Sequence, residues 1–192
     1  MSFQILTVCT GNVCRSPMAE LLLRAWGDPR ADLLVSSAGI QALIGHAIDR
    51  GSAAALGQLG IDPTHHRARQ FEPWMAADAD LILTAERAHR DQVMLDAPSA
   101  FRRTFTMKEF ARLAPAVRSA DARTAIAEAA AARASTGPVP LEDDDMPDPY
   151  RRAARHAKTI AQQITEAVQV TLDMLSFSPR RVLAERPLPS SQ

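Results

Sequence analysis

Short apolar runs that alternate with amphipathic helical segments are the feature that most limits the possible folds of this chain. Short, largely apolar or β-branched runs occupy 3–8, 33–37 and 81–84, and residues 101–105, which begin and end with phenylalanine, are a candidate fourth strand. Segments with apolar residues at helical spacing separate them. Strands joined through helices form parallel sheets covered on both faces. We therefore predict an α/β fold, a single three-layer domain with a four-stranded parallel sheet flanked by helices.

The helical segments have recognisable ends. Pro17 opens the first and Gly27 closes it, because proline suits the first helical turn and glycine the residue after the last. Further helices are predicted over 49–59, 86–95, 107–113, 119–135 and 152–175. The helix over 119–135, capped by Ser119, is rich in alanine and reads as an exposed elaboration, spanning about 114–138, on a compact core. We assign residues 1–176 to the domain and 177–192 to a flexible tail, with an acidic, proline-rich loop over 136–149.

Composition argues against several classes of protein. Hydrophobic residues make up 46% of the chain, enough for a sizeable core, and Lys plus Arg equals Asp plus Glu at 22 each. A balanced charge gives no general attraction to nucleic acid or to anionic membranes. No run approaches the roughly 20 apolar residues needed to span a bilayer, so we expect no membrane insertion. We expect a cytoplasmic protein, a monomer, that needs no cofactor and has no metal site.

The most informative segment runs from Cys9 to Pro17, where a strand ends, a short loop turns and a helix begins. Ligands of open α/β sheets bind beyond such strand ends. Amides in a tight loop and at a helix start converge on anions. Gly11 and Asn12 are residue types that accept the left-handed conformations this curvature needs. The segment therefore predicts a site for a phosphate group, bound by the loop residues Thr10, Gly11, Asn12, Val13, Cys14 and Ser16.

Two side chains of this loop are suited to act in a reaction on a bound phosphate group. The positive surroundings of Cys9 favour its thiolate, which is the nucleophilic form of cysteine. The planar guanidinium of Arg15 is suited to gripping two phosphate oxygens. Ser16 has a hydroxyl that can donate to the sulfur when it becomes a leaving group. The alternative is an ordinary buried cysteine at a strand end, which the flanking Gly-Asn and Ser-Pro make improbable.

The chain resembles the low-molecular-weight protein tyrosine phosphatases. Their signature Cys-x-Gly-Asn-x-Cys-Arg-Ser-Pro stands at 9–17, and three further family marks follow in the family's order: Ser-Ala-Gly at 37–39, His-x-Ala-Arg-Gln at 66–70 and Asp-Pro-Tyr at 148–150. The resemblance implies a phosphatase that hydrolyses phosphotyrosine through a phosphocysteine intermediate on Cys9. It also implies that Asp148 is the general acid and base, while the neighbouring Asp143, Asp144 and Asp145 read as an ordinary acidic turn.

The resemblance assigns supporting roles as well. Asn12 is expected to be left-handed, with Ser37 and His66 as candidates to hold it by hydrogen bonds. Leu43 and Tyr150 are expected to form two walls of the substrate crevice. The aliphatic segment around Leu43 resembles bacterial phosphatases that are paired with tyrosine kinases of exopolysaccharide export, so the expected partners are phosphotyrosine proteins, among them a bacterial tyrosine kinase.

Several alternatives stay open at this point. An arsenate reductase shares this fold and loop; because no cysteine follows Cys14, it would need an external thiol to resolve its intermediate. A non-catalytic phosphate-binding module is a third reading, which the presence of both Cys9 and Asp148 disfavours. Cys14 is either a small apolar residue or a thiol that forms a protective disulfide with oxidised Cys9.

Overall fold

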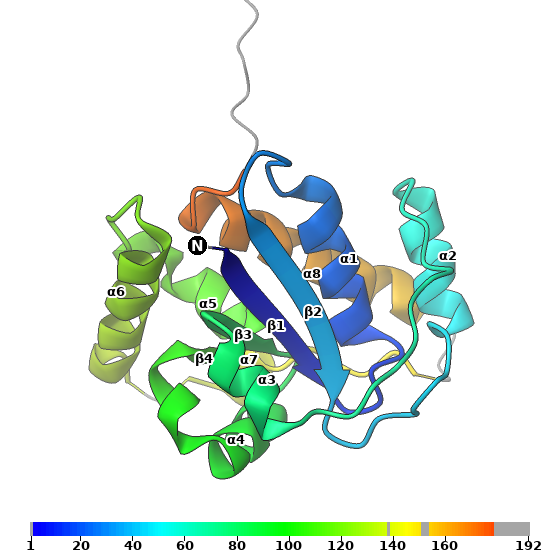
Figure 1. Cartoon of the computed structure of the whole chain (residues 1–192), viewed down its shortest axis with the longest axis horizontal. Helices are drawn as coiled ribbons and strands as arrows, with labels where there is room; N and C mark the ends of the chain where they lie inside the picture. Colours follow the sequence, from blue (N-terminus) through cyan, green and yellow to red (C-terminus); the bar gives the residue numbers. More distant parts are fainter. Residues whose placement is uncertain (1, 138, 151–153, 179–192) are drawn as a thin grey trace, which may run out of the picture.

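The computed structural model describes residues 2–137, 139–150 and 154–178 of the chain (Figure 1). Its four strands are β1 (Phe3–Cys9), β2 (Leu33–Gly39), β3 (Leu81–Thr84) and β4 (Thr104–Thr106). They form one sheet in the order β2-β1-β3-β4, and every pairing is parallel. The predicted four-stranded parallel sheet is thus confirmed, with all strand ends that carry chemistry at one edge.

Helices cover both faces of the sheet, as expected for strands joined by crossovers. The helices are α1 (Arg15–Trp26), α2 (Arg50–Gln58), α3 (Pro73–Asp78), α4 (Arg87–Asp96), α5 (Met107–Leu113), α6 (Ala122–Ser135), α7 (Leu141–Asp144) and α8 (Ala154–Met174). Short 3-10 helices occupy Pro98–Arg103 (η1) and Ala114–Ala116 (η2). Within the described part of the chain, no helix is both long and apolar enough to cross a membrane.

The core has two parts, one on each face of the sheet. The larger joins β1 to α1, α5 and α8, and includes Leu22, Phe110 and Ile164, which are fully buried. The smaller joins the other face to α3 and α4 through Phe71, Met75 and Val93. Figure 1 shows α2 and α6 at opposite ends of the molecule, with α6 beyond the β4 edge. This is the three-layer arrangement that the alternation of apolar runs predicted.

The fourth strand and one short helix differ from the prediction. The fourth strand was expected over 101–105, but residues up to Arg103 form η1 and the strand is Thr104–Thr106. Pro98 at the start of η1 fixes a helical φ angle, and this tight turn takes up residues whose β-forming side chains suggested a strand. The short helix α3, which begins at Pro73, was not predicted.

The alanine-rich helix also differs from its prediction. Its cap is Asp121, whose carboxylate accepts a hydrogen bond from the Thr124 amide, whereas the Ser119 hydroxyl only accepts from the Asp121 amide. One face of α6 is buried through Ala125, Ile126 and Ala129. The helix is therefore packed on the domain and is exposed on one side only.

The structure describes only part of the predicted tail, 177–192, and of the helix predicted over 152–175. Phe177, placed in the tail by the sequence, packs on Phe3 with ring centroids 5.0 Å apart. The rest of the predicted tail, 179–192, lies outside the described residues, as do the first residues of the helix predicted from Arg152.

Candidate active site

The loop between β1 and α1 is held from outside by its carbonyl groups. The amides of Ile40, Gln41 and Leu43 donate to the carbonyls of residues 9, 10 and 11, at 3.0 Å each. By contrast, the backbone amides of residues 10–14 donate no hydrogen bond to any described residue. Free amides in a tight loop are donors for an anion. The loop therefore has the arrangement that binding of a phosphate group requires.

Asn12 sets the curvature of this loop. Its φ angle is 54°, so the expected left-handed conformation is confirmed. The side chain is fully buried; its amide nitrogen donates to the hydroxyls of Ser16 (2.9 Å) and Ser37 (2.8 Å). Its carbonyl oxygen accepts from the Arg69 amide at 2.9 Å, and the His66 ring lies 2.8 Å from its backbone carbonyl. These four contacts offset the cost of a left-handed non-glycine residue.

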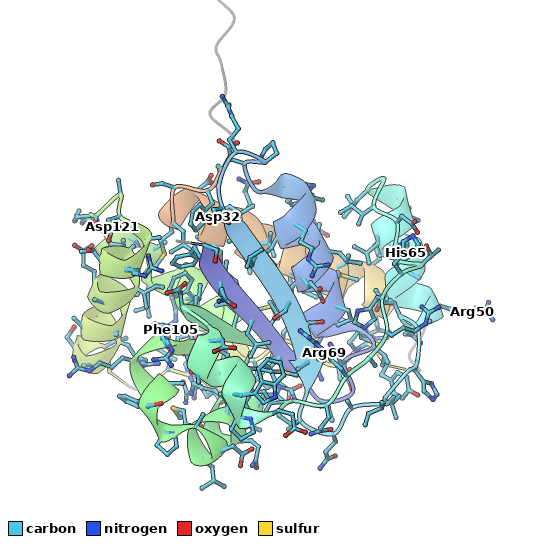
Figure 2. All side chains as sticks on the ribbon, viewed as in Figure 1. Asp32, Arg50, His65, Arg69, Phe105 and Asp121 are labelled. Carbon is cyan, nitrogen blue, oxygen red and sulfur yellow. The ribbon has the colours of Figure 1, made fainter. Side chains whose placement is uncertain are left out.

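The end of β2 lies against the loop from the other side. A side-chain carbon at Gly39 would stand 2.9 Å from the backbone nitrogen of Asn12 and closer still to the backbone carbonyl oxygen of Thr10. Only glycine leaves room for this approach of two backbones. Arg69, which Figure 2 shows beside this end of β2, donates to the Ser37 carbonyl at 2.7 Å and ties the neighbouring segment to the same strand.

Cys9 lies at the last position of β1 and is 2% exposed. Its sulfur is 3.0 Å from the Ser16 hydroxyl oxygen. That oxygen accepts a hydrogen bond from Asn12, and its proton has two acceptors within reach, the sulfur and the Ala38 carbonyl oxygen at 3.3 Å. A hydroxyl donor stabilises a sulfur that carries negative charge.

Arg15 is buried to 2% exposure and is held firmly. One terminal nitrogen forms an ion pair with Glu86 and donates to the Met146 carbonyl at 2.8 Å; the other lies 3.4 Å from Asp148. Its Nε atom is buried and has no partner among the described residues. An unsatisfied buried donor is costly, and an oxyanion in the adjacent loop is a natural acceptor for it.

Asp148 therefore lies near the loop, although it comes from a segment far away in sequence. Its side chain is 46% exposed, and it accepts a hydrogen bond from the Tyr150 amide at 3.3 Å. The contact with Arg15 brings together two of the three residues that the sequence selected for catalysis. The third, Cys9, belongs to the same loop as Arg15.

The three aspartates before Asp148, which were expected to form an ordinary acidic turn, differ in burial and in partners. Asp144 is 2% exposed and forms ion pairs with Arg87 (2.6 Å) and Arg112 (2.9 Å). The Asp145 carboxylate accepts from the Arg87 amide at 2.7 Å. Only Asp143 is exposed. Asp144 and α7 thus anchor the segment that leads to Asp148, and Asp144 stays buried because two guanidinium groups compensate its charge.

Leu43 and Tyr150 meet at one apolar cluster. Both are partly buried and pack against Val13, Cys14 and Ala68. They come from two segments that lie far apart in the sequence, as the two expected walls do. The cluster gives the loop an apolar border, which favours a ligand with a hydrophobic body.

Cys14 is buried in this cluster and neither cysteine is in a disulfide. Burial raises the pKa of the Cys14 thiol to about 12, and the carboxylate of Asp49 adds to this effect. Cys14 is therefore a neutral thiol at physiological pH.

Three residues of the site were missed from the sequence. Glu86 pairs with Arg15, His89 lies 2.8 Å from the Thr10 hydroxyl, and Glu20 accepts a hydrogen bond from Ser37. Burial lowers the pKa of His89, and the charge of Arg15 lowers it further. Glu86 lies two residues after the end of β3, so the strand-end rule that selected Cys9 also pointed to it. Glu20 carried no such signal.

The chain is similar to known phosphatases. Residues 4–129 match the model of the family described as low molecular weight phosphotyrosine protein phosphatase. A relative from Klebsiella pneumoniae, a "putative low molecular weight protein-tyrosine-phosphatase", is 28% identical over 89% of this chain and 96% of its own length. The Etp phosphatase of Escherichia coli is 31% identical over 78% of each chain.

The fold is also similar to solved phosphatase structures. The tyrosine phosphatase AmsI of Erwinia amylovora superposes with a TM-score of 0.70 at 26% identity, covering 92% of this chain and 95% of that one. The YwlE arginine phosphatase of Geobacillus stearothermophilus also has a TM-score of 0.70, at 25% identity, covering 91% and 93%.

Proposed function

Because the chain belongs to the low-molecular-weight protein tyrosine phosphatase family, we propose that it hydrolyses phosphotyrosine through a phosphocysteine intermediate. The Cys9 thiolate attacks phosphorus, an S–P bond forms and the bond to the tyrosine oxygen breaks. Asp148 gives its proton to that oxygen, so that tyrosine leaves neutral. Asp148 then takes a proton from water, which attacks phosphorus, releases phosphate and restores the thiolate.

One observation carries this proposal: the loop that follows Cys9 has five backbone amides without partners among the described residues, and Arg15 at its end contacts Asp148. Donors already in place stabilise negative charge in the transition state without reorganisation. The roles of Asn12, Ser37 and His66 follow from the same logic, since they fix the loop that presents these amides. Ser16 stabilises the sulfur when it leaves.

The substrate class is the finer part of the proposal. Tyrosine and arginine phosphatases share this fold, as the relatives AmsI and YwlE illustrate. A phenyl ring suits the apolar border formed by Leu43, Val13 and Tyr150, because aromatic rings gain from stacking and from burial. A guanidinium group needs polar or acidic partners there. We therefore favour phosphotyrosine, with Leu43 and Tyr150 as the two walls.

Arsenate reduction with an external thiol is the less favoured alternative, since the relatives compared above are phosphatases. The proposed partners are phosphotyrosine proteins, among them a bacterial tyrosine kinase, and the proposed location is the cytoplasm. The similarity to EpsP of Ralstonia solanacearum, a probable low molecular weight protein-tyrosine-phosphatase (40% identical over 55% of this chain and 70% of its own length), supports phosphotyrosine as the substrate.

The test is a direct comparison of substrates. The purified chain is assayed with a phosphotyrosine peptide, a phosphoarginine peptide, and arsenate plus glutathione. We expect efficient release of phosphate from phosphotyrosine alone, and none from the Cys9→Ser variant. A preference for phosphoarginine would overturn the substrate assignment, and turnover by Cys9→Ser would overturn the mechanism.

A further inference from the structure

A second cavity lies between α6 and the rest of the domain. Its volume is about 740 Å³, and its other walls come from α4, η1, α5 and the residues Thr136, Gly137, Val139 and Asp144. This is within the range of small-molecule sites, roughly 300–1,000 Å³. None of its lining residues belongs to the phosphate loop, and Asp148 is not among them. The cavity is thus separate from the candidate active site.

Its walls are strongly positive. Seven arginines line it against two carboxylates, those of Glu109 and Asp144; the arginines include Arg87, Arg90, Arg102, Arg112 and Arg133. The two carboxylates neutralise only part of this charge: Asp144 pairs with Arg87 and Arg112, and Glu109 pairs with Arg90 and Arg133. Arg123 pairs with Asp80, outside the cavity. Among the described residues, Arg102 and Arg103 are thus left without an ion pair. The cavity therefore keeps an excess of guanidinium groups with room between them.

Two arginines have unused hydrogen-bonding capacity. Arg102 is exposed and makes no hydrogen bond or ion pair with any described residue. Arg103 has a buried Nε atom without a partner in the described part of the chain. Arg133 and Arg90 share Glu109, at 4.0 and 3.1 Å. An anion between these groups would satisfy free donors and reduce the repulsion between Arg90 and Arg133.

The opposite wall is apolar and comes from one face of α6. Ala127, Ala130, Ala131 and Ala134 recur there at helical spacing and line the cavity. Phe101, 55% exposed, adds an aromatic side chain to the rim. Small side chains leave space for a flat or compact apolar body, and an inorganic anion would leave this wall uncovered.

We propose that this cavity binds an organic phosphate, with its phosphate groups on the arginines and its apolar body against the alanine face of α6. Guanidinium groups pair with phosphate oxygens through two parallel hydrogen bonds, which favours phosphate over weaker anions. This goes beyond the phosphatase activity, because it requires neither Cys9 nor the phosphate loop.

The experiment is calorimetric titration of ADP into the full chain carrying Cys9→Ser, which cannot turn the ligand over. In that background we compare Ala131→Trp, which fills the cavity from an exposed position, and Arg102→Ala, which removes a free guanidinium. Arg50→Ala is the matched control, since Arg50 is exposed at the start of α2, at the far end of the molecule from α6 (Figure 2). Binding to the phosphate loop is common to all four proteins, so differences report the cavity.

We expect Ala131→Trp to abolish one class of ADP site and Arg102→Ala to weaken it by about tenfold, the effect of one charge-assisted hydrogen bond. Arg50→Ala should leave it unchanged. Adenosine and inorganic pyrophosphate, each carrying half of the ligand, should bind this site at least about tenfold more weakly than ADP. Identical titrations for Cys9→Ser with and without Ala131→Trp would overturn the proposal. Equal affinity for pyrophosphate would overturn the role of the alanine face.

Discussion

The phosphate loop and the acid segment meet at Arg15 but are held in different ways. The loop over 9–16 is fixed inside the domain, where Asn12 and Ser16 are fully buried and share hydrogen bonds. The acid segment over 141–150 is fixed at a distance: Asp144 is buried between two arginines, whereas Asp148 is 46% exposed. The phosphate loop is thus fixed at the residues that surround Cys9. The acid segment is fixed at Asp144, four residues before the acid itself.

This difference separates two tasks. Binding an oxyanion needs several donors in fixed positions at once, which only a buried network supplies. Transferring a proton needs one group that reaches the leaving oxygen and then exchanges its proton with water, so partial exposure suits it. Changes in the loop should therefore impair both binding and catalysis, while changes in the acid segment should impair catalysis alone.

The largest effect that tests this separation is expected for Asp148→Ala. The rate on phosphotyrosine should fall by about 10²–10⁴-fold, because the phenolate then leaves unprotonated. The fall should be smaller for aryl phosphates with acidic leaving groups, and affinity for vanadate should stay unchanged. Steady-state kinetics measure all three. Asp143→Ala, at an exposed neighbouring acid, is the control; equal losses in both variants would rule out Asp148 as the acid.

Removal of the anchor should act on stability first. Asp144→Ala leaves Arg87 and Arg112, which are partly exposed, without their shared carboxylate, and loss of hydrogen bonds to a charged group costs about 1.5–3 kcal/mol. Urea denaturation followed by circular dichroism gives the change. Asp143→Ala should change the free energy of unfolding by less than about 0.5 kcal/mol. A stability of Asp144→Ala equal to wild type would show that the anchor is unimportant.

Two substitutions at Asn12 differ only in how well the new residue accepts the left-handed backbone conformation. Asn12→Gly keeps the left-handed backbone accessible but loses the side-chain hydrogen bonds, at about 1–2 kcal/mol. Asn12→Ala loses the same bonds and adds about 1 kcal/mol of backbone strain. Both should weaken inhibition by phosphate, measured against p-nitrophenyl phosphate. If glycine and alanine behave alike, the φ angle of 54° does not matter for function.

The smallest effect concerns the second cysteine of the loop. Because the pKa of Cys14 is raised to about 12, its thiolate fraction is negligible at pH 7 and grows only as pH rises toward that value. Iodoacetamide at pH 7 should therefore modify Cys9 before Cys14 in the native protein, as read by peptide mass spectrometry. In guanidinium chloride both should react. Faster native modification of Cys14 would contradict its burial as a neutral thiol.

Sequence alone predicted the sheet, because periodicity and strand length are local properties. It also selected the loop from Cys9 to Ser16, because that motif carries its own turn and helix start. It did not predict the partners of Asp144 or the pairing of Arg15 with Glu86, since these join residues 32 to 71 positions apart. It misplaced the cap of α6 for a different reason, because Ser119 and Asp121 are equally good cap residues and only packing decides between them.

The tight approach of Gly39 to the Thr10 carbonyl has a consequence for comparing genomes. A search that demands only the cysteine and the arginine of the loop also recovers chains whose second strand ends in a bulkier residue. In such chains the added carbon would push the backbone out of the curve that gathers its amides. A small residue at that strand end, some thirty positions downstream of the cysteine, should therefore distinguish active phosphatases from homologues that have lost activity.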